Sequence, residues 1–186
     1  MSEDKPKRKK FIPPKPPFKE LRPDHRPVFG VSMQHERLVG RVTIEWSRLE
    51  NVLNDVIWRF LNLSFEDGRA ITGRDDATTK ISLLRIIAPR HLANDDKLEA
   101  LLLVLDAVDS LRDDRNFIVH GAWGRIEPDG TPLAMSLRAK SKPDQVTGET
   151  FPSSRMYLIV EKITKMKEML LLLLTEIDAS PDTLLK

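Results

Sequence analysis

Apolar side chains recur at steps of three and four residues through four segments of the chain. This spacing places them on one face of an α-helix, so it predicts four amphipathic helices. The expected helices cover residues 33–63, 78–88 and 95–120, and a last segment that starts at Ser153 or Ser154 and runs to Ile177. Pro89 is expected to end the second helix, because proline has no amide hydrogen and clashes with the preceding turn.

Between the last two helices the pattern changes to alternation. Leu133, Met135 and Leu137 alternate with small or polar residues, and a Pro-Asp-Gly turn at 128–130 separates them from residues 123–127. Alternation on both sides of such a turn predicts a β-hairpin. The glycine-containing connection after residue 63 and the polar segment 140–152 are expected to be loops. The sequence therefore predicts an all-α four-helix bundle with a small β-hairpin inserted before the last helix.

The N-terminal segment differs from the rest in charge and in proline content. Residues 1–27 carry nine Lys or Arg against four acids, and they hold seven of the 13 prolines. Such a composition favours an extended or disordered chain over packed structure. We therefore divide the chain into a basic, proline-rich tail over residues 1–30 and a helical domain over residues 31–180. The tail could bind nucleic acid through phosphate contacts, bind a proline-recognising domain, or only solubilise the protein.

The composition excludes several classes of protein. The 186 residues include no cysteine, which excludes disulfides and thiolate zinc sites, and the four histidines have no zinc-ligand spacing. The longest apolar run is six residues, far short of the roughly 20 that a membrane span needs. We expect a cytoplasmic protein without membrane contact, metal or cofactor.

The last helix has more apolar surface than one face can bury. Met169, Leu171 and Leu172 flank its main apolar stripe. A helix that is apolar on most sides must be covered by something. A second subunit and the interior of the bundle are both consistent with this pattern.

Ionisable groups gather where the third helix ends, in Arg112 and in the run Arg115-Asn-Phe-Ile-Val-His120. This run resembles the Arg-Asn-x-x-x-His signature of the HEPN superfamily, whose helical members include many metal-independent ribonucleases of toxin and antiviral systems. The resemblance covers roughly residues 33–178. It implies a HEPN-like fold, an RNA substrate, a homodimer with its RNA cleft at the interface, and restraint by an antitoxin protein. HEPN relatives without catalysis imply the alternative, an inactive HEPN-like helical dimerisation, RNA-binding or protein-binding module.

The chemistry of metal-free RNA cleavage suits these side chains. The 2′-OH attacks the adjacent phosphate and leaves a 2′,3′-cyclic phosphate and a 5′-OH. His120 can transfer the proton at neutral pH, and Arg115 can stabilise the charge that develops on the phosphate. Asn116 can position either group through its amide, and Arg112 is an auxiliary phosphate contact.

The spacing of the motif raises a geometrical problem. Five residues along an ideal helix rotate the side chain by about 140° around the axis, so Arg115 and His120 do not share a face. Either the helix distorts near Gly121, or the sites of two subunits meet across a two-fold axis, which is what the resemblance implies.

Two other interpretations of these residues compete with a catalytic one. Arg115 could simply pair with a nearby acid: Glu45, Glu50, Asp113 or Asp114. The pair Arg85…His91 also has a HEPN-like spacing, but no asparagine follows the arginine and Pro89 interrupts the segment, so we treat it as a decoy.

Overall fold

The computed structural model describes residues 27–92, 95–126, 131–136 and 147–179. Most of the predicted tail, the Pro-Asp-Gly turn and residues 180–186 lie outside these described residues. The described part contains five helices: α1 (Met33–Phe60), α2 (Phe65–Thr72), α3 (Ala77–His91), α4 (Asp95–His120) and α5 (Ser153–Ala179). Its strands are β1 (Pro27–Phe29), β2 (Ala122–Ile126), β3 (Thr131–Ser136) and β4 (Thr147–Thr150). The predicted class is confirmed: a helical protein with a small antiparallel sheet before the last helix.

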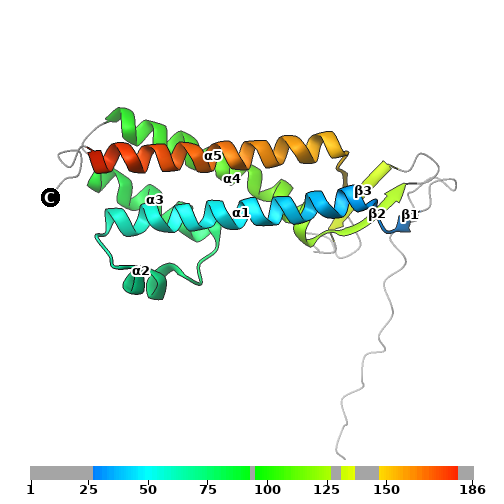
Figure 1. Cartoon of the computed structure of the whole chain (residues 1–186), viewed down its shortest axis with the longest axis horizontal. Coiled ribbons are helices and arrows are strands. Elements are labelled where there is room, and N and C mark those ends of the chain that lie inside the picture. The colour runs from blue at the N-terminus through cyan, green and yellow to red at the C-terminus, as the bar shows by residue number, and fades with distance from the viewer. Residues whose placement is uncertain (1–26, 93–94, 127–130, 137–146, 180–186) are drawn as a thin grey trace, which may run out of the picture.

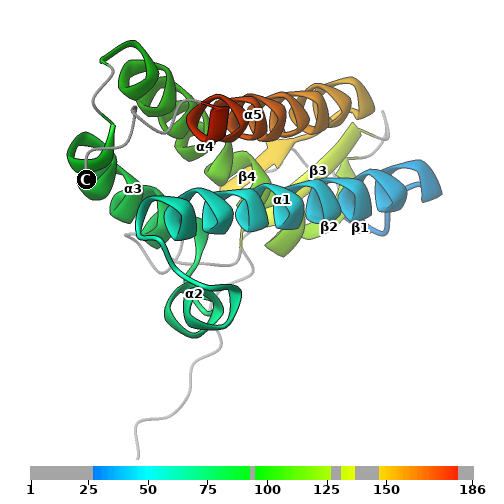
Figure 2. The ribbon, with the colours of Figure 1, turned by 60° about the vertical axis from the view of Figure 1, so that its left-hand side comes forward.

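The long helices form the bundle, and its core lies where their apolar stripes meet. α1 and α5 run side by side along the length of the molecule, and α4 packs against both (Figures 1 and 2). α3 packs against α1 and α4. The largest fully buried side chains include Trp46, Leu49, Leu53 and Ile57 of α1, Leu101, Leu105 and Ile118 of α4, and Met156 and Ile163 of α5. Burial of these stripes is the main force that holds the helices together.

α1 begins and ends on identifiable signals. The Ser32 side chain accepts the backbone N–H of His35 and so caps the first turn. The histidine ring is buried and contacts two hydroxyl groups, Ser32 Oγ at 2.9 Å and Ser153 Oγ at 3.4 Å. At the other end Asn62 has φ of 51°, a left-handed conformation that asparagine tolerates better than most residues. α1 therefore stops three residues before the predicted end.

The prediction of a loop after α1 was wrong, because α2 occupies residues 65–72. Ser64 caps this helix by accepting the backbone N–H of Asp67. Gly68 does not break it but lets it approach α1, since a Cβ at Gly68 would lie 2.5 Å from the Trp58 ring. Trp58 Nε1 also donates to Thr72 Oγ1 at 2.8 Å. A glycine that permits close packing has the same sequence signal as one that marks a loop.

The predicted end of the second helix at Pro89 was also wrong. α3 continues through Pro89 to His91, and the Leu92 amide donates to the Ala88 carbonyl at 2.9 Å. Pro89 lies in the last turn, where proline removes one hydrogen bond and the residues after it keep theirs.

The predicted hairpin is confirmed and is part of a larger sheet. β2 and β3 pair antiparallel in a register that joins Ala122 to Met135 and Ile126 to Thr131. β1 pairs with β2, and β4 with β3, which gives the order β1-β2-β3-β4. β1 falls inside the segment assigned to the tail, and β4 inside the predicted polar loop. Both strands have three or four residues, too few for alternation to be visible in the sequence.

The surplus apolar residues of α5 are not buried within the bundle. Met169, Leu171 and Leu172 are 40%, 44% and 60% exposed. Of the two open interpretations, burial in the bundle is therefore wrong. No helix of the described residues is long and apolar enough to cross a membrane.

Candidate functional site

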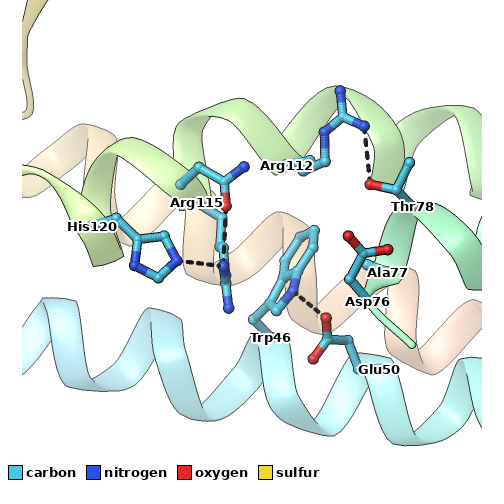
Figure 3. Close-up of a pocket in the computed structure, with 9 residues that line it drawn as sticks. Trp46, Glu50, Asp76, Ala77, Thr78, Arg112, Arg115 and His120 are labelled. Carbon is cyan, nitrogen blue, oxygen red and sulfur yellow. Dashed lines mark hydrogen bonds between the residues drawn. The ribbon is translucent and has the colours of Figure 1, made fainter. Parts of the chain in front are cut away.

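A pocket of about 260 Å³ opens between α1, the beginning of α3 and the second half of α4 (Figure 3). Its wall includes all four residues that the sequence singled out on α4. The complete lining is Trp46, Glu50, Asp76, Ala77, Thr78, Arg112, Arg115, Asn116 and His120.

Three side chains of the HEPN-like motif meet in this pocket. Nη1 of Arg115 donates to Oδ1 of Asn116 at 3.0 Å and lies 3.2 Å from Nε2 of His120. His120 is exposed, whereas Arg115 and Asn116 are half-buried. The arginine and the histidine are therefore neighbours within one chain, at a solvent-accessible position.

The side chains of Arg115 and His120 start about 140° apart around the axis of α4, yet they meet without either of the two arrangements that the spacing suggested. α4 is helical to His120, and the Gly121 amide still donates to the Phe117 carbonyl. The long Arg115 side chain spans the angle by itself. Helix geometry constrains where a side chain begins, but an arginine has four rotatable bonds beyond that point. The motif thus needs neither a distorted helix nor a second subunit to bring its residues together.

Arg115 is held without a carboxylate partner. Its guanidinium lies 5.5 Å from the centroid of the buried Trp46 ring, a cation–π contact. Its Nε is buried and makes no hydrogen bond, and no ion pair joins Arg115 to any of the described residues. A guanidinium has five donors, and both contacts here are made by Nη1, so the two N–H groups of Nη2 remain available to a ligand.

The acids considered as partners of Arg115 have other contacts. Glu45 is buried and pairs with Lys167 at 2.8 Å and with Arg48 at 2.6 Å. The hydrogen bond from Lys167 is the main reason that the pKa of Glu45 is lowered. Glu50 accepts from Trp46 Nε1, Asp113 lies 3.8 Å from Arg112, and Asp114 pairs with Arg155 at 2.7 Å.

Arg112 lines the same pocket but is already neutralised. It pairs with Asp109 at 3.2 Å, lies 3.8 Å from Asp113, and donates to Thr78 Oγ1 at 3.1 Å. The last contact joins α4 to the first turn of α3. Arg112 therefore fixes the pocket wall, and its charge is less free for a phosphate than that of Arg115.

Two acidic pocket residues were not identified as site residues by the sequence analysis. From the sequence, Glu50 was considered only as a possible ion-pair partner of Arg115, and Asp76 was not considered. Asp76 caps α3: the Thr79 backbone N–H donates to its carboxylate at 2.9 Å and holds its pKa below the ordinary value. The sequence signal for Asp76 was its position as a helix cap, which does not reveal that α4 lies opposite.

The last turn of α4 is anchored on both sides. Trp123 Nε1 donates to the Ile118 carbonyl at 2.8 Å. Arg155 of α5 bonds Asp114 at 2.7 Å and Glu149 at 2.9 Å, and its guanidinium lies over the Phe151 ring. The sheet and the start of α5 thus hold the helix end that carries Arg115 and His120.

The described residues contain no group of three or more His, Asp and Glu side chains placed to hold a metal ion. Comparison with known proteins found no matching family model, no matching curated protein and no matching solved structure.

Proposed function

We propose that this protein is a metal-independent endoribonuclease of HEPN type. The observation that carries the proposal is the contact of 3.2 Å between Arg115 and His120 in an open pocket. An exposed histidine next to an arginine without a carboxylate partner supplies a proton-transfer group and a phosphate-binding group at one point.

The roles of the residues follow from donors and acceptors. A guanidinium can only donate, so the contact with His120 is a hydrogen bond when Nε2 is the unprotonated ring nitrogen. A substrate phosphate that binds Arg115 would take the place of Nε2 as its partner. The freed Nε2 would then accept the proton of the attacking 2′-OH, and Arg115 would stabilise the charge on the phosphorane. As the P–O5′ bond breaks, the departing 5′-oxygen would take a proton from solvent and leave as the 5′-OH.

Asn116 and Trp46 are positioning residues in this mechanism. The amide oxygen of Asn116 accepts from Arg115 Nη1, and the Trp46 ring supports the guanidinium from one side. Neither contact neutralises the charge of Arg115. The auxiliary phosphate contact proposed for Arg112 is weaker, because two aspartates already face its guanidinium.

The proposal includes a homodimer, and the exposed apolar side chains of α5 support one. A shallow apolar groove lies between α4 and α5, and its lining includes Val104, Met169 and Leu172. Val104 precedes Arg115 by roughly 16 Å along α4. A dimer through this groove alone would therefore not bring the two motifs to the symmetry axis. An antitoxin protein that restrains a toxin or defence ribonuclease is a further partner in this proposal.

The experiment that tests the activity uses the full chain, total RNA and EDTA. We expect cleavage in EDTA, products that end in 2′,3′-cyclic phosphates, and strongly slowed cleavage by His120→Ala. Unchanged cleavage by folded His120→Ala would contradict the assignment.

The alternative is a silent module that binds RNA or protein. The observation in its favour is that Arg115 and His120 satisfy each other, as residues with a purely structural role would. RNA binding without cleavage by the wild-type chain would support it.

A further inference from the structure

The two ends of the pocket differ in chemistry. Figure 3 shows Arg115 and His120 at one end, Glu50 and Asp76 at the other, and Trp46 between them. The second end is unexpected in a site for a polyanion, because carboxylates repel phosphate. The pKa of Asp76 is lowered by the Thr79 hydrogen bonds, which keeps this group ionised at neutral pH.

Each of these carboxylates has one oxygen without a partner among the described residues. Oε1 of Glu50 accepts from Trp46 Nε1 at 3.0 Å, and Oδ1 of Asp76 accepts the backbone N–H and the hydroxyl of Thr79, both at 2.9 Å. Within the described part of the chain, Oε2 of Glu50 and Oδ2 of Asp76 have no hydrogen bond and no ion pair. The second end therefore provides two charged acceptors, one on α1 and one at the cap of α3.

Donors lie beside these acceptors. Thr78 Oγ1 accepts from Arg112, so its own hydroxyl hydrogen is free to donate. The Arg112 guanidinium adds further N–H groups on the same wall. A ligand that fits here presents several N–H donors and has an acceptor next to them.

Among the RNA bases, guanine fits this arrangement best. Its Watson–Crick edge presents N1–H and the N2 amino group as neighbouring donors, followed by the O6 acceptor. Adenine and cytosine have one donor group on that edge, and uracil has one donor between two acceptors. The pocket, at about 260 Å³, is slightly below the usual range for small-molecule sites, which leaves room for about one nucleotide.

We propose that the Glu50–Asp76 end of the pocket binds a guanine base of the RNA substrate and thereby sets the sequence specificity. This inference rests on the proposed ribonuclease function. The carboxylates accept from N1–H and N2–H, and Arg112 or Thr78 donates to O6. Charge-assisted hydrogen bonds of this kind are the strongest that a protein makes to a neutral base.

Equilibrium binding of nucleoside monophosphates tests the proposal without any cleavage step. We would titrate full-length His120→Ala with GMP, IMP and UMP in a calorimeter. All three have the same phosphate, and IMP differs from GMP only by the missing N2 amino group. We expect IMP to bind about tenfold more weakly than GMP, because each lost bond to a charged acceptor costs about tenfold or more, and UMP to bind more weakly than IMP. Equal affinity for GMP and UMP would overturn the proposal.

Two conservative variants in the same His120→Ala background test whether the two carboxylates recognise the base. Glu50→Gln keeps an oxygen for Trp46 Nε1, and Asp76→Asn keeps a good helix cap, so both should fold. Each should bring the GMP-to-UMP affinity ratio close to one. Glu161→Gln, on the exposed surface of α5, is the matched control and should keep the wild-type ratio. A wild-type ratio in both pocket variants would overturn the assignment.

Cleavage data separate this inference from the proposed function. Sequencing of the ends that the wild-type chain makes in total RNA should show guanine enriched beside the cut. Cleavage without any base preference would contradict the guanine site and leave the ribonuclease function intact. GMP selectivity in a chain that never cleaves RNA would contradict the ribonuclease function and leave the guanine site intact.

Discussion

The chain contains two Arg…His pairs near helix ends, and their surroundings differ. At the end of α3, Arg85 pairs with Asp106 at 2.6 Å, and the His91 ring stacks on Phe60 with centroids 5.9 Å apart. At the end of α4, Arg115 has no carboxylate partner among the residues that the structure describes, and it contacts an exposed His120. The first pair is therefore divided between two separate structural contacts, and the second lines one pocket.

The comparison shows what a sequence motif leaves undetermined. Both pairs have a HEPN-like spacing, and both histidines lie at the last residue of a helix. The difference comes from the residue that faces each arginine across the bundle. An aspartate neutralises Arg85, whereas the face of Trp46 supports Arg115 and leaves its charge available.

The largest expected effect concerns the two histidines. We predict that His120→Ala lowers the rate of RNA cleavage by about 10² to 10⁴, the usual contribution of a positioned proton-transfer group. The matched variant His91→Ala should keep the wild-type rate, because His91 lies outside the pocket. Single-turnover rates on one labelled oligoribonucleotide measure both, and an equal loss in the two variants would remove the distinction between the pairs.

Substitution of the two arginines should have unequal effects on the cleavage rate, as with the two histidines. Arg115→Lys should lower the cleavage rate about 10²- to 10³-fold, because an ammonium cannot replace the planar guanidinium at a phosphate and loses its contact with Asn116. Arg85→Lys keeps the charge opposite Asp106 and should cleave at the wild-type rate. Full activity of folded Arg115→Lys would show that the guanidinium has no role in the reaction.

The effect on the free energy of unfolding should be larger for His91→Ala than for His120→Ala, the reverse of the effect on cleavage. His91→Ala removes the stacked contact with Phe60 and should lower the free energy of unfolding by about 0.5–1.5 kcal/mol. His120→Ala removes an exposed ring and should change it by less than about 0.5 kcal/mol. Denaturant unfolding of both variants tests this. A clear destabilisation by His120→Ala would instead support a structural role for the Arg115–His120 contact.

The smallest effect concerns Glu45, a buried carboxylate that, unlike Arg115, is paired with two groups of opposite charge. The Lys167 and Arg48 contacts lower the pKa of Glu45 in the folded state, so this group stabilises the fold fully above its ordinary value of 4.5. That contribution is lost as the pH falls through the lowered value. The stability difference between wild type and Glu45→Gln should therefore shrink on acidification below 4.5. Melting temperatures at several pH values measure it, and a difference independent of pH would contradict the pairing.

Long periodic segments made the bundle predictable. α1, α4 and α5 each have 26 residues or more, so their apolar stripes repeat often enough to be unambiguous. The hairpin was also predictable, since alternation on both sides of a Pro-Asp-Gly turn has few other solutions. The short elements α2, β1 and β4 were not predicted, because they depend on contacts with α1 and with neighbouring strands rather than on their own pattern.

The sequence singled out the α4 side chains that line the pocket, but not the geometry of the pocket. Arg115, Asn116 and His120 are adjacent in sequence and remain adjacent in space. Glu50 lies on α1 and Asp76 caps α3, so their place in the pocket depends on how α1 and α3 pack against α4. The spacing of Arg115 and His120 suggested a distorted helix or a second subunit as the way in which they meet. In the structure the long Arg115 side chain reaches His120 by itself.

The sequence by itself determined the helical class, the hairpin and the polar cluster at the end of α4, because periodicity and turn chemistry are local properties of the chain. Only the tertiary structure decided which arginine keeps its charge free and which acids complete the pocket. Those outcomes depend on Asp106, Trp46, Glu50 and Asp76, whose distance from each arginine is set by helix packing and not by separation along the chain.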